Sequence, residues 1–497
     1  MIGATLGAVS RVRVAGPGAE LLPDDGLYDV LLAGGRIRDI APTGALRLPG
    51  EVHDADGAYL IPGLWDHHVH VTQAALAARR VSLEGVGSAT AAADRMASAP
   101  VHADGRRIGV GMRDAFWTDP PTRALLDAAT GDVPTYVLNA DLHSAWLNSA
   151  ALAREGIATD DDVLREGPAF EVGTRLNAVS PSEADDAVAA LARRAASRGV
   201  VGVVDLDLFW NEESWRRRVD AGFDGLRVEF GIYPEHLDRA IAAGLQTGDP
   251  LRGGRSELVR VGPLKVITDG SLGTRTAACS HPYPHDPHDR GMLAVPPAEL
   301  LRLMTAATGA GIACAIHAIG DEANRHALDA FALSGAWGTI EHAQLVARTD
   351  IPRFARLGVG ASVQPEHALD DRDLTDTIWA AQTATPYPLR SLADAGVNLL
   401  LGSDAPVAPL DPWAAMASAV FRTRDGRTPW HDEETLPFGV ALAASTHGGS
   451  LHPSAIEVGA PADLVLCARD PRTAGETDLR SMEVRATLLG GRVTHLD

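Results

Sequence analysis

Short β-branched runs alternate with alanine-rich helical stretches through most of this 497-residue chain. One helical stretch, SEADDAVAALARRAASRG, offers Ser182 and Asp185 as candidate caps and precedes the strand-like run VVGVVDLDL. Further strand candidates are RVEFGIY, PLKVITD, IACAIHAIG, TIEHAQLV, VGASVQP and NLLLGSDAP. A strand followed by a helix, repeated about eight times, predicts an α/β fold with a parallel sheet closed into a (β/α)8 TIM barrel.

The two ends of the chain carry a different pattern. Gly34-Gly35 interrupts YDVLLAGGRIRDIAP, and a second Gly-Gly pair interrupts VRATLLGGRVTHLD near the carboxyl end. Two glycines between short apolar runs are typical of a β-hairpin. We therefore expect both termini, residues 1–58 and 453–497, to form one small β domain beside a barrel domain at 59–452.

Polar residues end several of the candidate strands. In PGLWDHHVH, His68 and His70 are two residues apart, so in a strand they share one face and can bind one ion. The residues that end later strand candidates are His317, His342, Gln364 and Asp404. The carboxyl ends of barrel strands form one mouth, and imidazole and carboxylate are the ligands of a catalytic zinc or similar ion. The pattern predicts a metal site made by the four histidines and Asp404.

Lys265, in the candidate strand GPLKVI, is the only lysine among 44 basic residues. A protonated lysine among metal ligands would repel the ions, so in this position it must be neutral or chemically converted. A neutral amine can add CO₂ and become a carbamate, an anion with two oxygens that can bridge two cations. An arginine, which is always protonated, cannot do so. We therefore expect Lys265 to belong to the metal site.

The order of these candidate ligands along the chain, H-x-H, Lys, His, His and Asp, resembles the metal centre of the amidohydrolase superfamily. The resemblance is narrower still to its amidohydrolase family 3 or YtcJ-like branch. PGLWDHHVH resembles the first metal motif of that branch. PTRALLD and DLHSAWLNSAAL resemble its insertion after the first barrel strand, here at about 105–180. The motifs LKVITDGSLGTRTA, IHAIGDEANRHALDAF, EHAQLV, ASVQPEH, LLGSDAPV and GAPADLVLCARDP follow in the family's order. The resemblance extends nearly from end to end of the chain.

The resemblance implies a metal-dependent hydrolase of C–N bonds other than peptide bonds, with a β-sandwich built from both termini, similar to N-substituted formamide deformylase. His68 and His70 would bind the more buried of two zinc or other divalent ions, and His317 and His342 the outer ion. Carboxylated Lys265 would bridge the two ions. Asp404 would ligate the first ion and transfer the proton, while metal-bound hydroxide attacks an amide, N-formyl or N-acyl carbonyl.

Substrate contacts are predicted less directly. Trp117, His143 and Trp146 lie in the insertion, where they line the substrate pocket or form the core of a subdomain. Asp269 in TDGS and Gln364 in SVQP are expected to contact the substrate or to support the ligands.

Three alternatives stay open from the sequence. One is a mononuclear zinc N-acyl hydrolase with unmodified Lys265. Another is a deaminase of the same superfamily, although Lys265 and the glycine at position 320 argue against it. The third is a non-catalytic metal-binding protein that retains the barrel.

Charge and cysteine content exclude several classes of partner. The formal net charge is −21, which repels nucleic acid and anionic membrane surfaces. Three widely spaced cysteines, without a C-x-x-C pattern, indicate neither disulfides nor a zinc ribbon. No signal peptide or long apolar run is evident, so we expect a cytoplasmic enzyme with a small-molecule amide substrate, and a homodimer as the default assembly.

Overall fold

The computed structural model describes residues 2–102, 104–114, 117–140, 144–165, 167–251, 253, 256–284 and 286–497. The chain forms two compact units, one of Met1–Val71 with Ala192–Asp497 and the other of Thr72–Leu191. Within the described residues, no helix combines the length and apolar character needed to cross a membrane.

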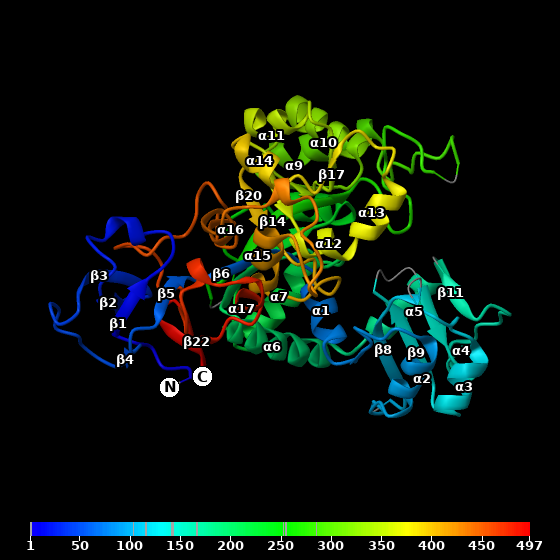
Figure 1. The fold of residues 1–497 in the computed structure, drawn as a ribbon, viewed down its shortest axis with the longest axis horizontal. Helices are drawn as coiled ribbons and strands as arrows, with labels where there is room; N and C mark the ends of the chain where they lie inside the picture. Colours follow the sequence, from blue (N-terminus) through cyan, green and yellow to red (C-terminus); the bar gives the residue numbers. More distant parts are fainter. Residues whose placement is uncertain are drawn as a thin grey trace. The chain divides into compact units, whose positions relative to one another are not determined.

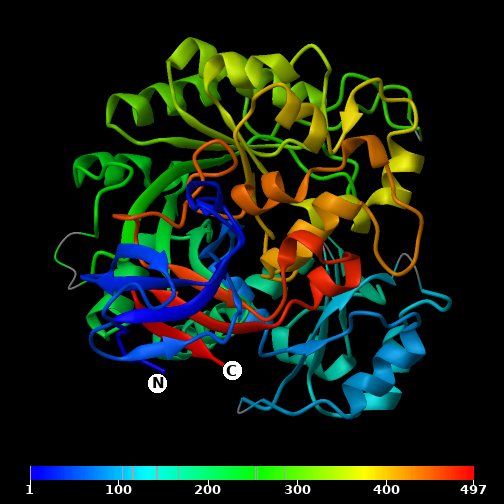
Figure 2. The ribbon, with the colours of Figure 1, turned by 60° about the vertical axis from the view of Figure 1, so that its left-hand side comes forward.

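Eight parallel strands of the first unit form a nearly closed barrel (Figures 1 and 2). In chain order they are β6 (Leu64–Val69), β12 (Val200–Asp205), β13 (Arg227–Ile232), β14 (Val259–Ile267), β15 (Cys314–Ala318), β16 (Gly338–His342), β18 (Gly360–Val363) and β20 (Leu399–Leu401). Each strand pairs with the next barrel strand along the chain. A parallel bridge between Val69 and Ala405 links the segment after the last strand to the first strand. The TIM barrel predicted from the alternating pattern is confirmed.

Helices follow the barrel strands and cover the outside of the sheet (Figure 2). The longer ones are α6 (Pro181–Ser197), α7 (Asn211–Asp220), α9 (Pro297–Gly309), α10 (Asp321–Ser334) and α15 (Pro412–Phe421). The shorter ones are α8 (Leu237–Ala242), α11 (Ile351–Leu357), α12 (Pro365–Asp370), α13 (Arg372–Ile378), α14 (Leu389–Asp394) and α16 (Phe438–Ala444). Helix α1 (Val71–Ala77) lies almost entirely in the second unit, and α17 (Glu476–Arg480) lies near the carboxyl end of the chain. Helix α6 begins at Pro181, and the Ser180 hydroxyl accepts the Glu183 amide at 3.2 Å. The expected caps Ser182 and Asp185 were therefore wrong, because both lie inside the helix.

Strands from both termini form a separate sheet in the first unit. Its strands are β1 (Ala8–Val14), β2 (Tyr28–Ala33), β3 (Arg36–Pro42), β4 (Val52–Asp54), β5 (Tyr59–Pro62), β21 (Leu464–Cys467), β22 (Val484–Leu489) and β23 (Arg492–Leu496). Antiparallel pairing of β5 with β21 joins the two ends of the chain. Both Gly-Gly pairs make the predicted hairpin turns, with φ of 58° and 75° at Gly34 and Gly35.

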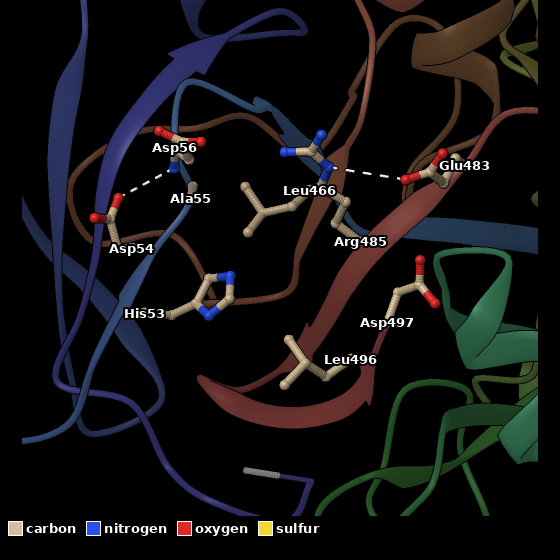
Figure 3. A pocket seen from close by; sticks show the side chains of 9 residues that line it. All are labelled: His53, Asp54, Ala55, Asp56, Leu466, Glu483, Arg485, Leu496 and Asp497. Carbon is tan, nitrogen blue, oxygen red and sulfur yellow. Dashed lines mark hydrogen bonds and ion pairs between the residues drawn. The ribbon is translucent and has the colours of Figure 1, made fainter.

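A pocket of about 200 Å³ lies in this terminal sheet domain (Figure 3). Asp54, Asp56, Arg485 and Asp497 are among the residues that line it. None of the predicted site residues contributes to the lining, so this pocket is not the predicted metal site.

The second unit contains a five-stranded sheet that was not predicted from the sequence. Its strands are β7 (Val81–Ser82), β8 (Arg107–Met112), β9 (Thr135–Asn139), β10 (Ser144–Leu147) and β11 (Val163–Arg165). Its helices are α2 (Ala89–Ala97), α3 (Arg123–Thr130), α4 (Ser149–Glu155) and α5 (Gly167–Asn177). Leu126, Val137 and Trp146 are fully buried between these elements.

Candidate metal centre

All six predicted ligands lie at or near the carboxyl ends of barrel strands. His68 lies in β6 and His70 directly follows this strand, Lys265 lies in β14, and His317 lies in β15. His342 ends β16, and Asp404 follows β20. Because parallel barrel strands end at the same rim, six positions that are up to 336 residues apart converge there.

His68 is fixed from both sides of its ring. Its Nδ1–H donates to Glu341 Oε2 at 2.6 Å, and both side chains are buried. Its Nε2 therefore presents a lone pair, 3.3 Å from Lys265 Nζ and 3.4 Å from Asp404 Oδ1. Burial, together with the nearby Lys265, lowers the pKa of His68 to about 4, so the imidazole is neutral and able to bind a cation at neutral pH.

Asp404 reaches the site through a tight turn after β20. Its φ is 58°, and its amide donates to the His68 carbonyl at 2.7 Å. A Cβ at Gly402 would lie 2.8 Å from the backbone nitrogen of His68, so the turn requires glycine there. Asp404 Oδ1 lies 3.3 Å from His70 Nε2. Although burial opposes ionisation, the neighbouring His68 and His70 hold the pKa of Asp404 well below its usual range.

His342 also occupies a strained backbone position, with φ of 72° at the end of β16. Its Nδ1–H donates to Gln364 Oε1 at 2.8 Å, which leaves the Nε2 lone pair free. Ligand atoms of His68, His342 and Asp404 all lie within 4.8 Å of one another. These three residues form the tightest part of the cluster.

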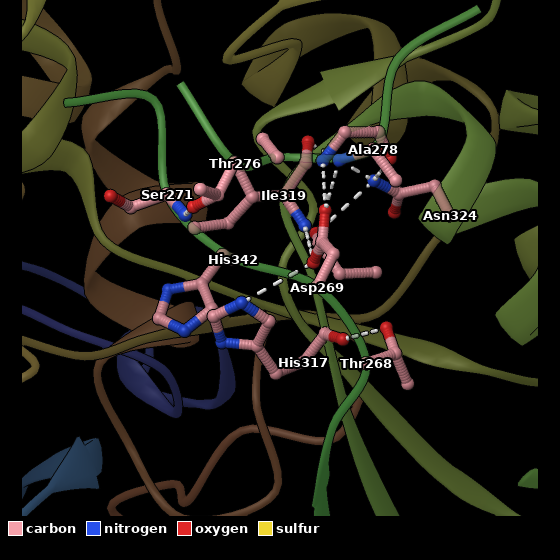
Figure 4. A network of polar contacts seen from close by, with 12 residues as sticks. Thr268, Asp269, Ser271, Thr276, Ala278, His317, Ile319, Asn324 and His342 are labelled. Carbon is pink, nitrogen blue, oxygen red and sulfur yellow. Dashed lines mark hydrogen bonds and ion pairs between the residues drawn. The ribbon is translucent and has the colours of Figure 1, made fainter. Parts of the chain in front are cut away.

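His317 joins the cluster through its contact with His342, whose ring centroid lies 4.5 Å away in an edge-to-face arrangement. Behind it, Asp269 Oδ1 lies 3.4 Å from His317 Nε2 (Figure 4). The Asp269 carboxylate accepts the amides of Ala278, Ile319 and Gly320 at 2.9–3.1 Å. Asp269 therefore ties the loop after β14 to the end of β15 and faces His317.

Lys265 is almost completely buried and forms no salt bridge among the described residues. Burial lowers its pKa, although the charges of Glu341 and Asp404 oppose the shift. The amine therefore lies beside His68 without a directly paired carboxylate.

Two residues of the site were missed from the sequence. Glu341 precedes His342 directly, but only the folded barrel brings its carboxylate to His68. His367, in the motif QPEH, has its Nε2 4.0 Å from Asp404 Oδ2. A histidine three residues after Gln364 was the available signal.

The residues predicted to contact substrate lie in different places. Gln364 contacts His342 and Asp269 faces His317, so both lie at the histidine cluster. In the second unit, Trp146 is buried and donates to the Thr122 carbonyl at 3.1 Å, and Trp117 packs edge-to-face on it. His143 lies outside the described residues. Substrate contact by these side chains stays a prediction.

The donor set fits a divalent cation. Neutral imidazoles and a carboxylate converge, and partners on the far ring nitrogens of His68 and His342 leave their Nε2 atoms available. Among the described residues, the buried His70 Nδ1 and His317 Nε2 also have no hydrogen-bond partner. Bound cations would turn these otherwise unfavourable groups into ligands or their supports.

A model of the amidohydrolase family matches residues 51–495. The chain belongs to the amidohydrolase family. It is therefore a metal-dependent hydrolase that acts on C–N bonds, as the resemblance implied.

Three curated relatives match most of the chain. Protein LONG AFTER FAR-RED 3 from Arabidopsis thaliana is 30% identical over 88% of this chain and 82% of its own length. YtcJ from Bacillus subtilis (strain 168) is 26% identical over 88% of this chain and 89% of its own length. The N-substituted formamide deformylase of Arthrobacter pascens is 25% identical over 93% and 94%.

A solved structure shares the fold over nearly the whole length. The crystal structure of an uncharacterized metal-dependent hydrolase from Pyrococcus horikoshii OT3 is 25% identical and has a TM-score of 0.79. The match covers 95% of this chain and 99% of that protein.

Proposed function

We propose that this amidohydrolase cleaves a non-peptide amide, N-formyl or N-acyl bond of a small molecule. The observation that carries the proposal is the buried contact of Lys265 Nζ with His68 Nε2, beside Asp404. The amine is buried beside the nitrogen that His68 offers to a metal, and it has no directly paired carboxylate among the described residues. Its chemistry suits a metal bridge.

We propose zinc, or another divalent metal, as the cofactor, with two ions per chain. His68, His70, His317, His342 and Asp404 would hold them, and Lys265 as a carbamate would bridge them. When bound, such ions polarise a carbonyl and lower the pKa of water toward neutrality. The lowered pKa of Lys265 supports the carbamate, since only the neutral amine adds CO₂.

Asp404 is the group that we propose to move the proton. His68 and His70 both lie near its Oδ1 atom, and the His68 carbonyl accepts the Asp404 amide, so the carboxylate has a fixed orientation. It would take a proton from water and deliver it to the leaving nitrogen. Without that proton, the amine would leave slowly.

The substrate class rests partly on a relative. One similar protein is named for cleavage of N-substituted formamides, and a formamide is the smallest member of the proposed class. Deaminases of the superfamily are expected to carry an acidic residue a few positions after the third histidine. This chain has glycine at position 320 instead, which also favours amide hydrolysis.

The experiment is a panel of N-formyl, N-acetyl and cyclic amides offered to the metal-loaded protein, with product amine measured. The panel includes a dipeptide and an amino-substituted heterocycle as controls for peptidase and deaminase activity. Turnover of at least one amide with neither control consumed supports the proposal. Ammonia release from the heterocycle alone would identify a deaminase, and metal binding without any turnover would identify a binding protein.

A further inference from the structure

His367 is a buried histidine beside the candidate metal centre that the proposed ligand set does not use. It lies in α12, directly after β18, and is 6% exposed. Its ring stacks on His342 with centroids 6.3 Å apart and an interplanar angle of 15°. Among the described residues, its Nε2 atom has no hydrogen-bond partner. A buried polar atom without a partner points to a missing ligand.

Helix α12 is held firmly by ion pairs on its other side. Glu366 accepts Arg424 at 3.0 Å and Arg480 at 2.8 Å, and the Ser418 hydroxyl also donates to it. Asp370, one turn further along, accepts Arg424 at 2.6 Å. Because both ends of this short helix are anchored, the backbone that carries His367 is fixed relative to the barrel.

The unpartnered nitrogen faces one particular oxygen of Asp404. Asp404 Oδ1 lies near His68 and His70, whereas Oδ2 lies 4.0 Å from His367 Nε2. This separation is too long for a direct hydrogen bond. It does match a single nitrogen or oxygen atom that lies about 2.8 Å from each group, at normal hydrogen-bond length.

We propose that His367 is a catalytic residue that hydrogen-bonds the leaving nitrogen of the substrate. The inference rests on the proposed function. Hydrolysis adds the hydroxyl of water to the carbonyl carbon, the C–N bonding pair stays on nitrogen, and the remaining proton reaches that nitrogen through Asp404. His367 lies on the Oδ2 side of Asp404, where the leaving nitrogen receives its proton. Its imidazole hydrogen-bonds that nitrogen as the C–N bond breaks.

The test compares two amides that share an acyl group and differ in the leaving amine. One releases a simple alkylamine, which needs full protonation to leave, and the other releases nitroaniline, which leaves far more easily. We expect His367→Ala to lower kcat for the alkylamide by about 100-fold and for the nitroanilide by about tenfold or less. His367→Gln, which retains a hydrogen-bonding group, should recover part of the alkylamide rate. His326→Ala, on the outer helix α10, is the control.

Metal content and thermal unfolding are measured on each variant as readouts independent of turnover. Unchanged metal per chain and an unchanged midpoint, together with the leaving-group dependence, support the proposal. Equal losses for both amides, or metal content that falls in step with activity, would overturn it, because His367 would then be structural or a ligand. If the wild-type protein cleaves neither these amides nor any of the wider panel, the proposed function fails and this inference fails with it.

Discussion

Glu341 Oε2 lies 2.6 Å from His68 Nδ1 in the interior of the barrel, where neither side chain meets solvent. Burial works against its ionisation, yet the hydrogen bond from His68 lowers the pKa of Glu341 to about 2. A buried carboxylate on the far nitrogen of an imidazole fixes its tautomer and strengthens it as a ligand. Glu341 thus determines which atom His68 offers to a metal.

Glu341→Gln should therefore weaken metal binding by about 10- to 100-fold, measured by competition with a chromogenic chelator. The change keeps the side-chain volume but removes the charge that orients His68. Glu229→Gln is the matched control, because Glu229 also lies on a barrel strand and contacts a histidine, His447, at 3.1 Å. An affinity that is the same in both variants would contradict the role given to Glu341.

Lys265→Arg and Lys265→Ala should both reduce the bound metal from about two ions to about one per chain, because neither side chain can form a bridging carbamate. Elemental analysis measures the stoichiometry. In the wild-type protein, ¹³CO₂ should give a carbamate carbon signal by NMR that both variants lack. About one metal per chain in the wild type, unchanged by Lys265→Arg, would instead indicate the mononuclear alternative.

Asp269→Asn should destabilise the fold by about 2–3 kcal/mol, since an amide nitrogen would face backbone donors that the carboxylate now accepts. Denaturant unfolding measures the loss. Asp394→Asn, which removes an exposed ion pair with Arg390, should change the free energy of unfolding by less than about 0.5 kcal/mol. If the two variants are equally stable, the hydrogen bonds of Asp269 do not hold the loop.

The three cysteines should be unreactive until the chain unfolds. All are buried free thiols, and burial raises the pKa of both Cys279 and Cys314 to about 12. The thiol pKa values in the folded protein exceed the ordinary value of 9.0, so keeping these thiols protonated stabilises the fold. This stabilisation is complete below about pH 9 and is lost as the pH rises toward 12. A thiol reagent at pH 8 should modify none natively and all three in denaturant. Rapid native modification of any cysteine would contradict the burial.

Much of the barrel could be predicted because its signals are local. Each strand is a short apolar run, and a polar residue at its carboxyl end marks the rim, as at His317 and His342. Lys265 stood out because the chain otherwise uses arginine. The Gly-Gly turns of the terminal sheet were equally local features.

Contacts between strands could not be predicted in the same way. Glu341 precedes a predicted ligand, yet its contact with His68 spans 273 residues and depends on how β6 and β16 face the barrel interior. His367 gains meaning only from its distance to Asp404. Trp146 illustrates the converse, since its placement in the core of the second unit could not be separated from a pocket position by sequence alone.

The most direct test of the account measures metal content and amide turnover on one preparation before chelation, after chelation and during stepwise return of zinc. We expect turnover of the best panel amide to fall at least about 100-fold in the metal-free protein and to return as metal rises to about two ions per chain. A folded, metal-free protein that cleaves the amide at the original rate would contradict a metal centre at His68, His342 and Asp404.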